Sequence, residues 1–174
     1  IDDALGDIVT DRPEFINHAV AVNSATPDLM GLDRVPKDDR LLVGSSIVSG
    51  HGTGTDPETG RKCIREDLDQ VTNAVGRATT SQTDAFLLIA GLGGGTGSGG
   101  GPIIAEQLGR IYTEPVYGLG ILPAEEEGGI YSRNAANSIQ RFVDSTDSLL
   151  LFDNGASKSA GESLTEGYEE INTA

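Results

Sequence analysis

A run of glycines near the middle of the chain has the residue types and spacing that bind an anion. Residues 91–101 read Gly-Leu-Gly-Gly-Gly-Thr-Gly-Ser-Gly-Gly-Gly, directly after the apolar run 85–90 and directly before a helix-like stretch that starts at Pro102. Glycine permits backbone conformations in which several N–H groups converge on one ligand. We expect a helix to begin near Ser98, with the positive end of its dipole toward that ligand. The run therefore predicts a phosphate-binding loop between a strand and a helix.

Two nucleotide-binding motifs that occur more often, the Walker loop and the dinucleotide fingerprint, do not fit this loop. A Walker loop requires Lys and then Ser or Thr after its last glycine, whereas Pro102 follows Gly101 here. The dinucleotide fingerprint matches only in part, and Leu122-Pro123 occupies the region, about 20 positions later, where that motif requires an acidic residue. An NAD-dependent oxidoreductase is therefore disfavoured. A flexible linker is disfavoured as well, because patterned elements flank the run on both sides.

A second glycine-rich segment, residues 50–60, reads Gly-His-Gly-Thr-Gly-Thr-Asp-Pro-Glu-Thr-Gly. Alternating glycines can form a concave nest of N–H groups that holds an anion. His51 is interpreted as a hydrogen-bonding spacer rather than an acid or base, because no orienting partner is evident. Asp56 precedes a proline and is interpreted as a turn residue, with a place in the outer shell of a magnesium ion as the alternative.

Polar residues also follow the other strand-like runs. Residues 23–28 read Asn-Ser-Ala-Thr-Pro-Asp, which by itself predicts a turn. Residues 123–129 contain three consecutive Glu before two glycines, a pattern typical of favourable charge at a helix N-terminus. Tyr168 and Asn172 are spaced i, i+4 and share one helix face, where a ring can stack on a base and an amide can read its edge. Taken alone, that spacing is typical of ordinary helix surface.

The elements that must position these residues alternate along the chain. Strands are expected at residues 18–23, 41–44, 85–92, 115–122 and 148–152. Helices are expected at residues 61–77, 99–112 and 130–145. The strand runs are short and rich in Val, Ile and Leu, as buried parallel strands are. We therefore predict an α/β fold, a Rossmann-like parallel sheet with helices on both faces, whose ligands bind at the carboxyl ends of the strands.

The seven residues 93–99, Gly-Gly-Gly-Thr-Gly-Ser-Gly, resemble the signature loop of the tubulin and FtsZ superfamily of GTPases residue for residue. By this resemblance, residues 50–60 form the loop that senses the terminal phosphate, with Thr53, Gly54 and Thr55 as the candidates for γ-phosphate contact. Glu127 with Gly128 binds the ribose, and the bound nucleotide is GTP or GDP, with Mg²⁺ accompanying the triphosphate. The resemblance implies no catalytic residue within this chain and leaves the metal ligands open. The residues it assigns to nucleotide binding are Gly94, Gly95, Thr96, Gly97, Ser98, Thr53, Gly54, Thr55, Glu127, Asn154, Tyr168, Asn172, Asn23 and Ser24.

Within the superfamily, the chain resembles the archaeal CetZ family most. Tyr131 stands where FtsZ proteins have an Arg four residues after the ribose-binding Glu. The CetZ-like segments are Gly-Leu-Gly-Ile-Leu-Pro at 118–123, Leu-Phe-Asp-Asn at 151–154 and Gly-Glu-Ser at 161–163. The composition fits a protein built for high salt as well as an ordinary acidic cytosolic protein: 27 acidic residues face 12 basic ones, for a net charge of −15.

That charge and the cysteine count limit the function classes. A strongly acidic surface repels phosphate backbones and anionic lipid, so nucleic-acid binding is disfavoured. Cys63 is the only cysteine, which excludes an intrachain disulfide and suits a reducing compartment. The sequence has no apolar stretch near 18 residues and no secretory signal pattern, so we expect a cytoplasmic protein without membrane insertion.

The resemblance also predicts parts that the chain lacks. It implies that residues 1–174 are a partial GTP-binding domain, which lacks the first strand and phosphate loop and ends in the start of the family's central helix. The predicted protein polymerises head to tail with itself, hydrolyses GTP between subunits through a second domain, and acts in archaeal cell-shape control. The chain alone is expected to be inactive. The alternative is a non-hydrolysing GTP-binding regulator that joins filaments of other tubulin-like proteins.

Overall fold

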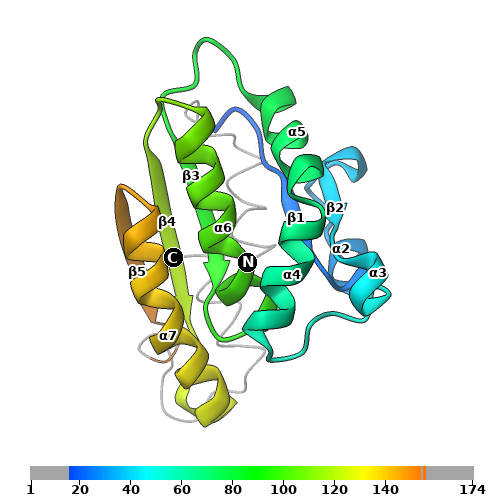
Figure 1. Ribbon diagram of the computed structural model, residues 1–174, viewed down its shortest axis with the longest axis vertical. Helices are drawn as coiled ribbons and strands as arrows, with labels where there is room; N and C mark the ends of the chain where they lie inside the picture. Colours follow the sequence, from blue (N-terminus) through cyan, green and yellow to red (C-terminus); the bar gives the residue numbers. More distant parts are fainter. Residues whose placement is uncertain (1–15, 154, 156–174) are drawn as a thin grey trace.

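The computed structural model describes residues 16–153 and 155, which form two parallel β-sheets and the helices packed against them (Figure 1). The first sheet pairs β1 (Ala21–Asn23) with β2 (Arg40–Leu42). The second has the order β3 (Phe86–Gly91), β4 (Val116–Leu122) and β5 (Ser148–Asp153). The helices are α2 (Thr26–Met30), α3 (Ser45–Val48), α4 (Pro57–Glu66), α5 (Leu68–Ala78), α6 (Gly95–Ile111) and α7 (Gly129–Ser145), with 3-10 turns η1 (Lys37–Asp39) and η2 (Glu125–Glu127).

The predicted α/β class and the parallel strand pairing are confirmed, and each predicted strand overlaps an observed one. The single helix predicted over 61–77 is wrong, because the chain bends at Asp67 and forms α4 and α5 instead. Asp67 has φ −111° and ψ 20°, and its Oδ2 accepts a hydrogen bond from the backbone N–H of Gly44 at 2.7 Å. Gly44 itself has φ +68°, which glycine adopts without strain. The helix break is thus fixed by a turn 23 residues earlier in the chain.

The structure of the glycine run, residues 91–101, also differs from the prediction. The helix predicted to begin near Ser98 begins at Gly95, so most of the run is helical rather than loop. A Cβ on Gly99 would lie 2.0 Å from the carbonyl oxygen of Pro57, and a Cβ on Gly60 would lie 2.0 Å from that of Gly95. Glycine in a helix interior costs about 1 kcal/mol relative to alanine. Here that cost is offset by backbone-to-backbone packing of α4 against α6, which no side chain would permit.

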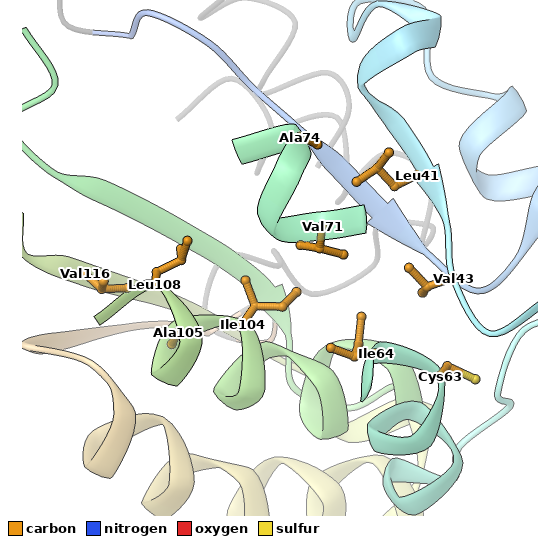
Figure 2. Close-up of a cluster of buried hydrophobic side chains, with 10 residues drawn as sticks. All are labelled: Leu41, Val43, Cys63, Ile64, Val71, Ala74, Ile104, Ala105, Leu108 and Val116. Carbon is orange, nitrogen blue, oxygen red and sulfur yellow. The ribbon is translucent and has the colours of Figure 1, made fainter. Parts of the chain in front are cut away.

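The hydrophobic core lies between the helices and one face of the sheets. Figure 2 shows its larger cluster, to which β2, α4, α5, α6 and β4 all contribute. A second cluster joins Phe142 of α7, which is fully buried, to Ala90 and Leu92 at the end of β3. Gly101 makes room for this ring, because a Cβ there would lie 2.4 Å from the Cζ atom of Phe142. The glycines of α6 therefore accommodate a helix on each side.

The helices α6 and α7 lie over one face of the three-stranded sheet (Figure 1). On the opposite face Leu87, Tyr117 and Leu150 are exposed, and the strand register places them on the same side of the sheet. Among the helices that the structure describes, none has the length and apolar character needed to cross a bilayer.

Candidate functional site

Three polar segments that are distant in the sequence meet at the side chain of Thr96. Its Oγ1 shares a hydrogen bond with Ser24 Oγ at 2.7 Å and another with Thr53 Oγ1 at 3.2 Å. Ser24 follows β1 and Thr96 follows β3, so the carboxyl ends of one strand from each sheet lie close together. Ser24 is fully buried, and this bond satisfies its hydroxyl. The predicted binding residues of these three segments are therefore neighbours in the fold.

The segment before α4 has the backbone of an anion nest. Gly50, Gly52 and Gly54 have φ of +75°, +81° and +57°, alternating with residues in ordinary conformations. Alternation of this kind turns successive N–H groups toward one side. The backbone N–H of Gly95 donates to the carbonyl of Gly54 at 3.1 Å. This hydrogen bond connects the nest to the start of α6.

The start of α6 presents the second set of donors. Gly94 is the N-cap residue with extended dihedral angles, and Gly95, Thr96 and Gly97 form the first turn. The first N–H groups of a helix have no acceptor within it, and they carry the positive end of the helix dipole. Ser98, a predicted binding residue, is 1% exposed, and its hydroxyl donates to the carbonyl of Gly94 within the helix.

The predicted ribose segment lies beside the glycine loop. Glu127 is half-buried in η2, and its Oε1 accepts a hydrogen bond from the backbone N–H of Ala124 at 2.8 Å. Gly93 fits between this segment and α7, because a Cβ on it would lie 3.1 Å from both Pro123 Cβ and Tyr131 Cδ1. One carboxylate oxygen of Glu127 is thus oriented by the backbone, which fixes the direction of the other.

For Asn23 and His51 the structure supports the simpler interpretation, a local structural role. Asn23 Oδ1 accepts from the backbone N–H groups of Ser24 and Ala25 at 2.7 and 3.1 Å, while its Nδ2 donates to Asp28 Oδ2 at 3.0 Å. Asn23 therefore shapes the turn into α2. The ring Nδ1 of His51 lies 3.2 Å from the carbonyl oxygen of Val48, a local contact that fits a spacer.

Asp56 caps α4. Its Oδ2 accepts from Thr59 Oγ1 at 2.6 Å, and its Oδ1 accepts from the backbone N–H of Glu58 at 3.0 Å. The hydroxyl of Thr59, followed by the N–H of Glu58, holds the pKa of Asp56 below its ordinary value. Both oxygens are used in the cap, and within residues 16–153 and 155 no group of three His, Cys, Asp or Glu side chains is placed to hold a metal ion.

The arrangement of these loops can be compared with known proteins. Residues 8–160 match the family model described as the Tubulin/FtsZ family, GTPase domain. The chain belongs to the Tubulin/FtsZ family.

Its curated relatives include the tubulin-like protein CetZ1 of Haloferax volcanii, which is 57% identical over 158 residues. That match covers 91% of this chain and 40% of the relative, so the chain spans less than half of the relative's length. A solved structure of CetZ1 from the same organism, a GDP-bound monomer, has a TM-score of 0.94 and 52% identity, covering 99% of this chain and 52% of that chain. A GTPγS-bound protofilament of CetZ2 from that organism has a TM-score of 0.90 and 39% identity, covering 98% and 50%.

Within this Tubulin/FtsZ domain, three predicted residues cannot be placed. Asn154, Tyr168 and Asn172 lie outside the described residues. The described residue nearest in sequence is Gly155, whose N–H donates to Asp153 Oδ1 at 2.8 Å, at the carboxyl end of β5. The predicted base-contacting residues therefore remain predictions.

Sequence reasoning missed Asn134 of α7. This side chain is 7% exposed, and it contacts the carbonyl oxygens of both Thr55 and Gly93, one from each glycine-rich segment. An Asn on the buried face of a helix that follows a binding loop is a weak signal, and the sequence pattern around it indicated only an amphipathic helix.

Proposed function

We propose that this chain is the guanine-nucleotide-binding part of a tubulin/FtsZ-like protein that assembles head to tail and hydrolyses GTP between subunits. The observation that carries the proposal is the meeting of the β1, 50–56 and β3 segments at Thr96, beside the N-terminus of α6. Together they present backbone N–H groups and hydroxyls, which are donors suited to phosphate oxygens. The proposal treats residues 1–174 as part of a nucleotide-binding domain.

Each segment has a separate role in this proposal. Within the predicted segment Gly94–Ser98, the N–H groups of Thr96 and Gly97 bind the phosphates, since the Gly95 N–H donates to Gly54 and the Ser98 N–H to Gly94. Thr53, Gly54 and Thr55 contact the terminal phosphate. Asn23 and Ser24 lie at the phosphate end of the nucleotide, where Ser24 hydrogen-bonds to Thr96. Glu127 accepts hydrogen bonds from the ribose hydroxyls through the oxygen that the Ala124 N–H leaves available. Asn154, Tyr168 and Asn172 recognise the guanine base.

Among the described residues, no cluster of three His, Cys, Asp or Glu side chains is placed to bind Mg²⁺. Asp56, the carboxylate nearest in sequence to the nest, is engaged on both oxygens by the α4 cap. Mg²⁺ commonly keeps several waters and binds chiefly to substrate phosphates. In our proposal the ion therefore arrives with the triphosphate, and the chain's own residues hold the phosphates around it.

Assembly and hydrolysis belong to the complete protein in this proposal. The CetZ2 relative, solved as a GTPγS-bound protofilament, supports head-to-tail self-association. An interface that does not close on itself generates filaments. Phosphoryl transfer relies on positioning and charge, so residues supplied by a neighbouring subunit can complete the site. We place the protein in the cytoplasm and in archaeal cell-shape control, with itself and other tubulin-like proteins as partners.

A binding test separates this proposal from a nucleotide-independent role. The full-length protein is titrated with GTP, GDP and ATP in the presence of Mg²⁺ at low and molar KCl. Thr96→Val keeps the shape of the side chain and removes the hydroxyl that joins Ser24 to Thr53, so we expect GTP affinity to fall about tenfold. Thr72→Val is the matched control, because the Thr72 hydroxyl bonds to the Leu68 carbonyl within α5, away from the site. No preference for guanine, or equal effects of both variants, would contradict the proposal.

Sedimentation and phosphate release, read on the same samples, decide between the two forms of the hypothesis. GTP-dependent pelleting with phosphate release supports a polymerising GTPase. Guanine-selective binding and pelleting without phosphate release supports the alternative, a non-hydrolysing regulator of such filaments.

A further inference from the structure

One amide group connects the two glycine-rich segments. Asn134 Nδ2 lies 2.7 Å from the carbonyl oxygen of Thr55 and 3.0 Å from that of Gly93. These carbonyls are 79 and 41 residues away in the sequence. Both acceptors require a donor, and the NH₂ of an Asn side chain has one hydrogen for each. The amide orientation follows from this pair of acceptors.

The position of Asn134 in the chain makes the contact informative. α7 begins at Gly129, directly after the Glu127-Gly128 segment that we propose for the ribose. Asn134 lies on the buried face of the second turn of α7. It therefore links the ribose segment, through the body of a helix, to the terminal-phosphate nest and to the phosphate loop.

Hydrogen bonds also join the nest to the start of α6: the Gly95 N–H donates to the Gly54 carbonyl, and the hydroxyls of Thr53 and Thr96 bond to each other. Asn134 holds the opposite end of the nest, at Thr55. With both ends held, the N–H groups of residues 53–55 have a fixed distance from the first turn of α6. Without Asn134, the Thr55 carbonyl loses this donor, and Thr55 is then positioned through Gly54, bonded to Gly95, and through the Asp56 cap of α4.

From this geometry we infer that Asn134 is a positioning residue that sets the preference of the site for a nucleoside triphosphate over a diphosphate. The inference rests on the proposed guanine-nucleotide function of these loops. A diphosphate is held by the N-terminus of α6, which Asn134 contacts at Gly93 but which is also held in place by its packing against α4 at Gly60 and Gly99. A third phosphate also needs the nest at its correct distance, which Asn134 supplies.

The test replaces the donor without changing the size of the side chain. Asn134→Asp places a carboxylate oxygen against two carbonyl oxygens, which repels both, and Asn134→Ala only removes the two hydrogen bonds. Asn137→Asp is the control for charge, because Asn137 lies three residues later in α7 and is exposed. Dissociation constants for GTP and GDP are measured on the full-length proteins with Mg²⁺ in molar KCl, and melting curves report folding.

We expect Asn134→Asp to weaken GTP binding about tenfold or more, and GDP binding by no more than about threefold. Asn134→Ala shifts the ratio in the same direction by a smaller factor, and it serves as the test if the Asp variant does not fold. Asn137→Asp leaves the ratio unchanged. Equal weakening of both nucleotides, as a merely structural role predicts, or an unchanged ratio in both Asn134 variants would overturn the inference. Absence of guanine-nucleotide binding by the wild-type protein would overturn this inference and the proposed function together, whereas guanine binding with an unchanged ratio would leave the function standing.

Discussion

Replacing Gly99 by alanine tests whether the glycines of α6 serve helix packing. The new Cβ would lie 2.0 Å from the carbonyl oxygen of Pro57, 2.8 Å from its carbonyl carbon and 3.0 Å from the backbone N of Arg61. All three atoms belong to the backbone of α4, so no side chain can rotate to relieve the contact. The two helices must move apart, which loosens the core around Ile64.

The size of the effect follows from two opposing contributions. Alanine in a helix interior is more favourable than glycine by about 1 kcal/mol. Overpacking costs about 1–3 kcal/mol, and we take about 3 because the clash is with backbone. The expected net loss is about 2 kcal/mol in the free energy of unfolding. Gly109 of the same helix is exposed and has no atom within 4 Å of its Cβ position, so Gly109→Ala should stabilise by about 0.5–1 kcal/mol.

Urea denaturation of the full-length protein, followed by far-UV circular dichroism, measures both variants against the wild type. With an m-value of about 2 kcal/mol/M, the Gly99→Ala midpoint should fall by about 1 M while the Gly109→Ala midpoint rises. If Gly99→Ala were as stable as Gly109→Ala, the backbone contact between α4 and α6 would not exist in solution, and the packing argument would be refuted.

Two further predictions concern titratable groups. The folded pKa of Asp56 is depressed, so its contribution to stability is present above the unfolded pKa near 3.8 and is lost as the pH falls through the lower folded value. Asp56→Ala should therefore cost about 1 kcal/mol at pH 7, and urea midpoints at pH 3 should show a smaller difference; an equal difference at both pH values would argue against the cap. Burial raises the pKa of the Cys63 thiol, which is fully buried and is the only thiol in the chain. Ellman's reagent at pH 8 should react slowly with the native protein and rapidly in denaturant, and fast stoichiometric labelling of the native protein would contradict the burial.

The parallel strands were predictable because their signal is local. Short apolar runs such as residues 116–122, which lie between Pro115 and Pro123, indicate a buried strand without knowledge of distant contacts. The glycines at the start of α6 are explained by close approach rather than by backbone freedom, since a Cβ on Gly95 would lie 2.4 Å from Thr53 Oγ1 and a Cβ on Gly97 would lie 2.3 Å from the carbonyl oxygen of Gly91; their role in binding stays a prediction.

The remaining features depend on contacts between distant residues. The break at Asp67 requires the N–H of Gly44, and neither residue by itself indicates the other. The second half of the glycine run has the composition of a loop, yet it is helical because Pro57, Ile64 and Phe142 approach its backbone. Asn134 was missed because its two acceptors are backbone carbonyls, which carry no sequence signal.

The direct contact between the backbones of α4 and α6 has a mechanical consequence. Side chains between packed helices can change rotamer and absorb a small displacement, but at Gly60 and Gly99 no side chain is present to do so. α4 has 10 residues and is about 15 Å long. Residues 53–55 precede its first residue, and Asp67, bound to Gly44, follows its last. Under the proposed function, a shift of residues 53–55 on gain or loss of a phosphate displaces α4 as a rigid body, and the displacement reaches Gly44, in the turn after β2, through Asp67.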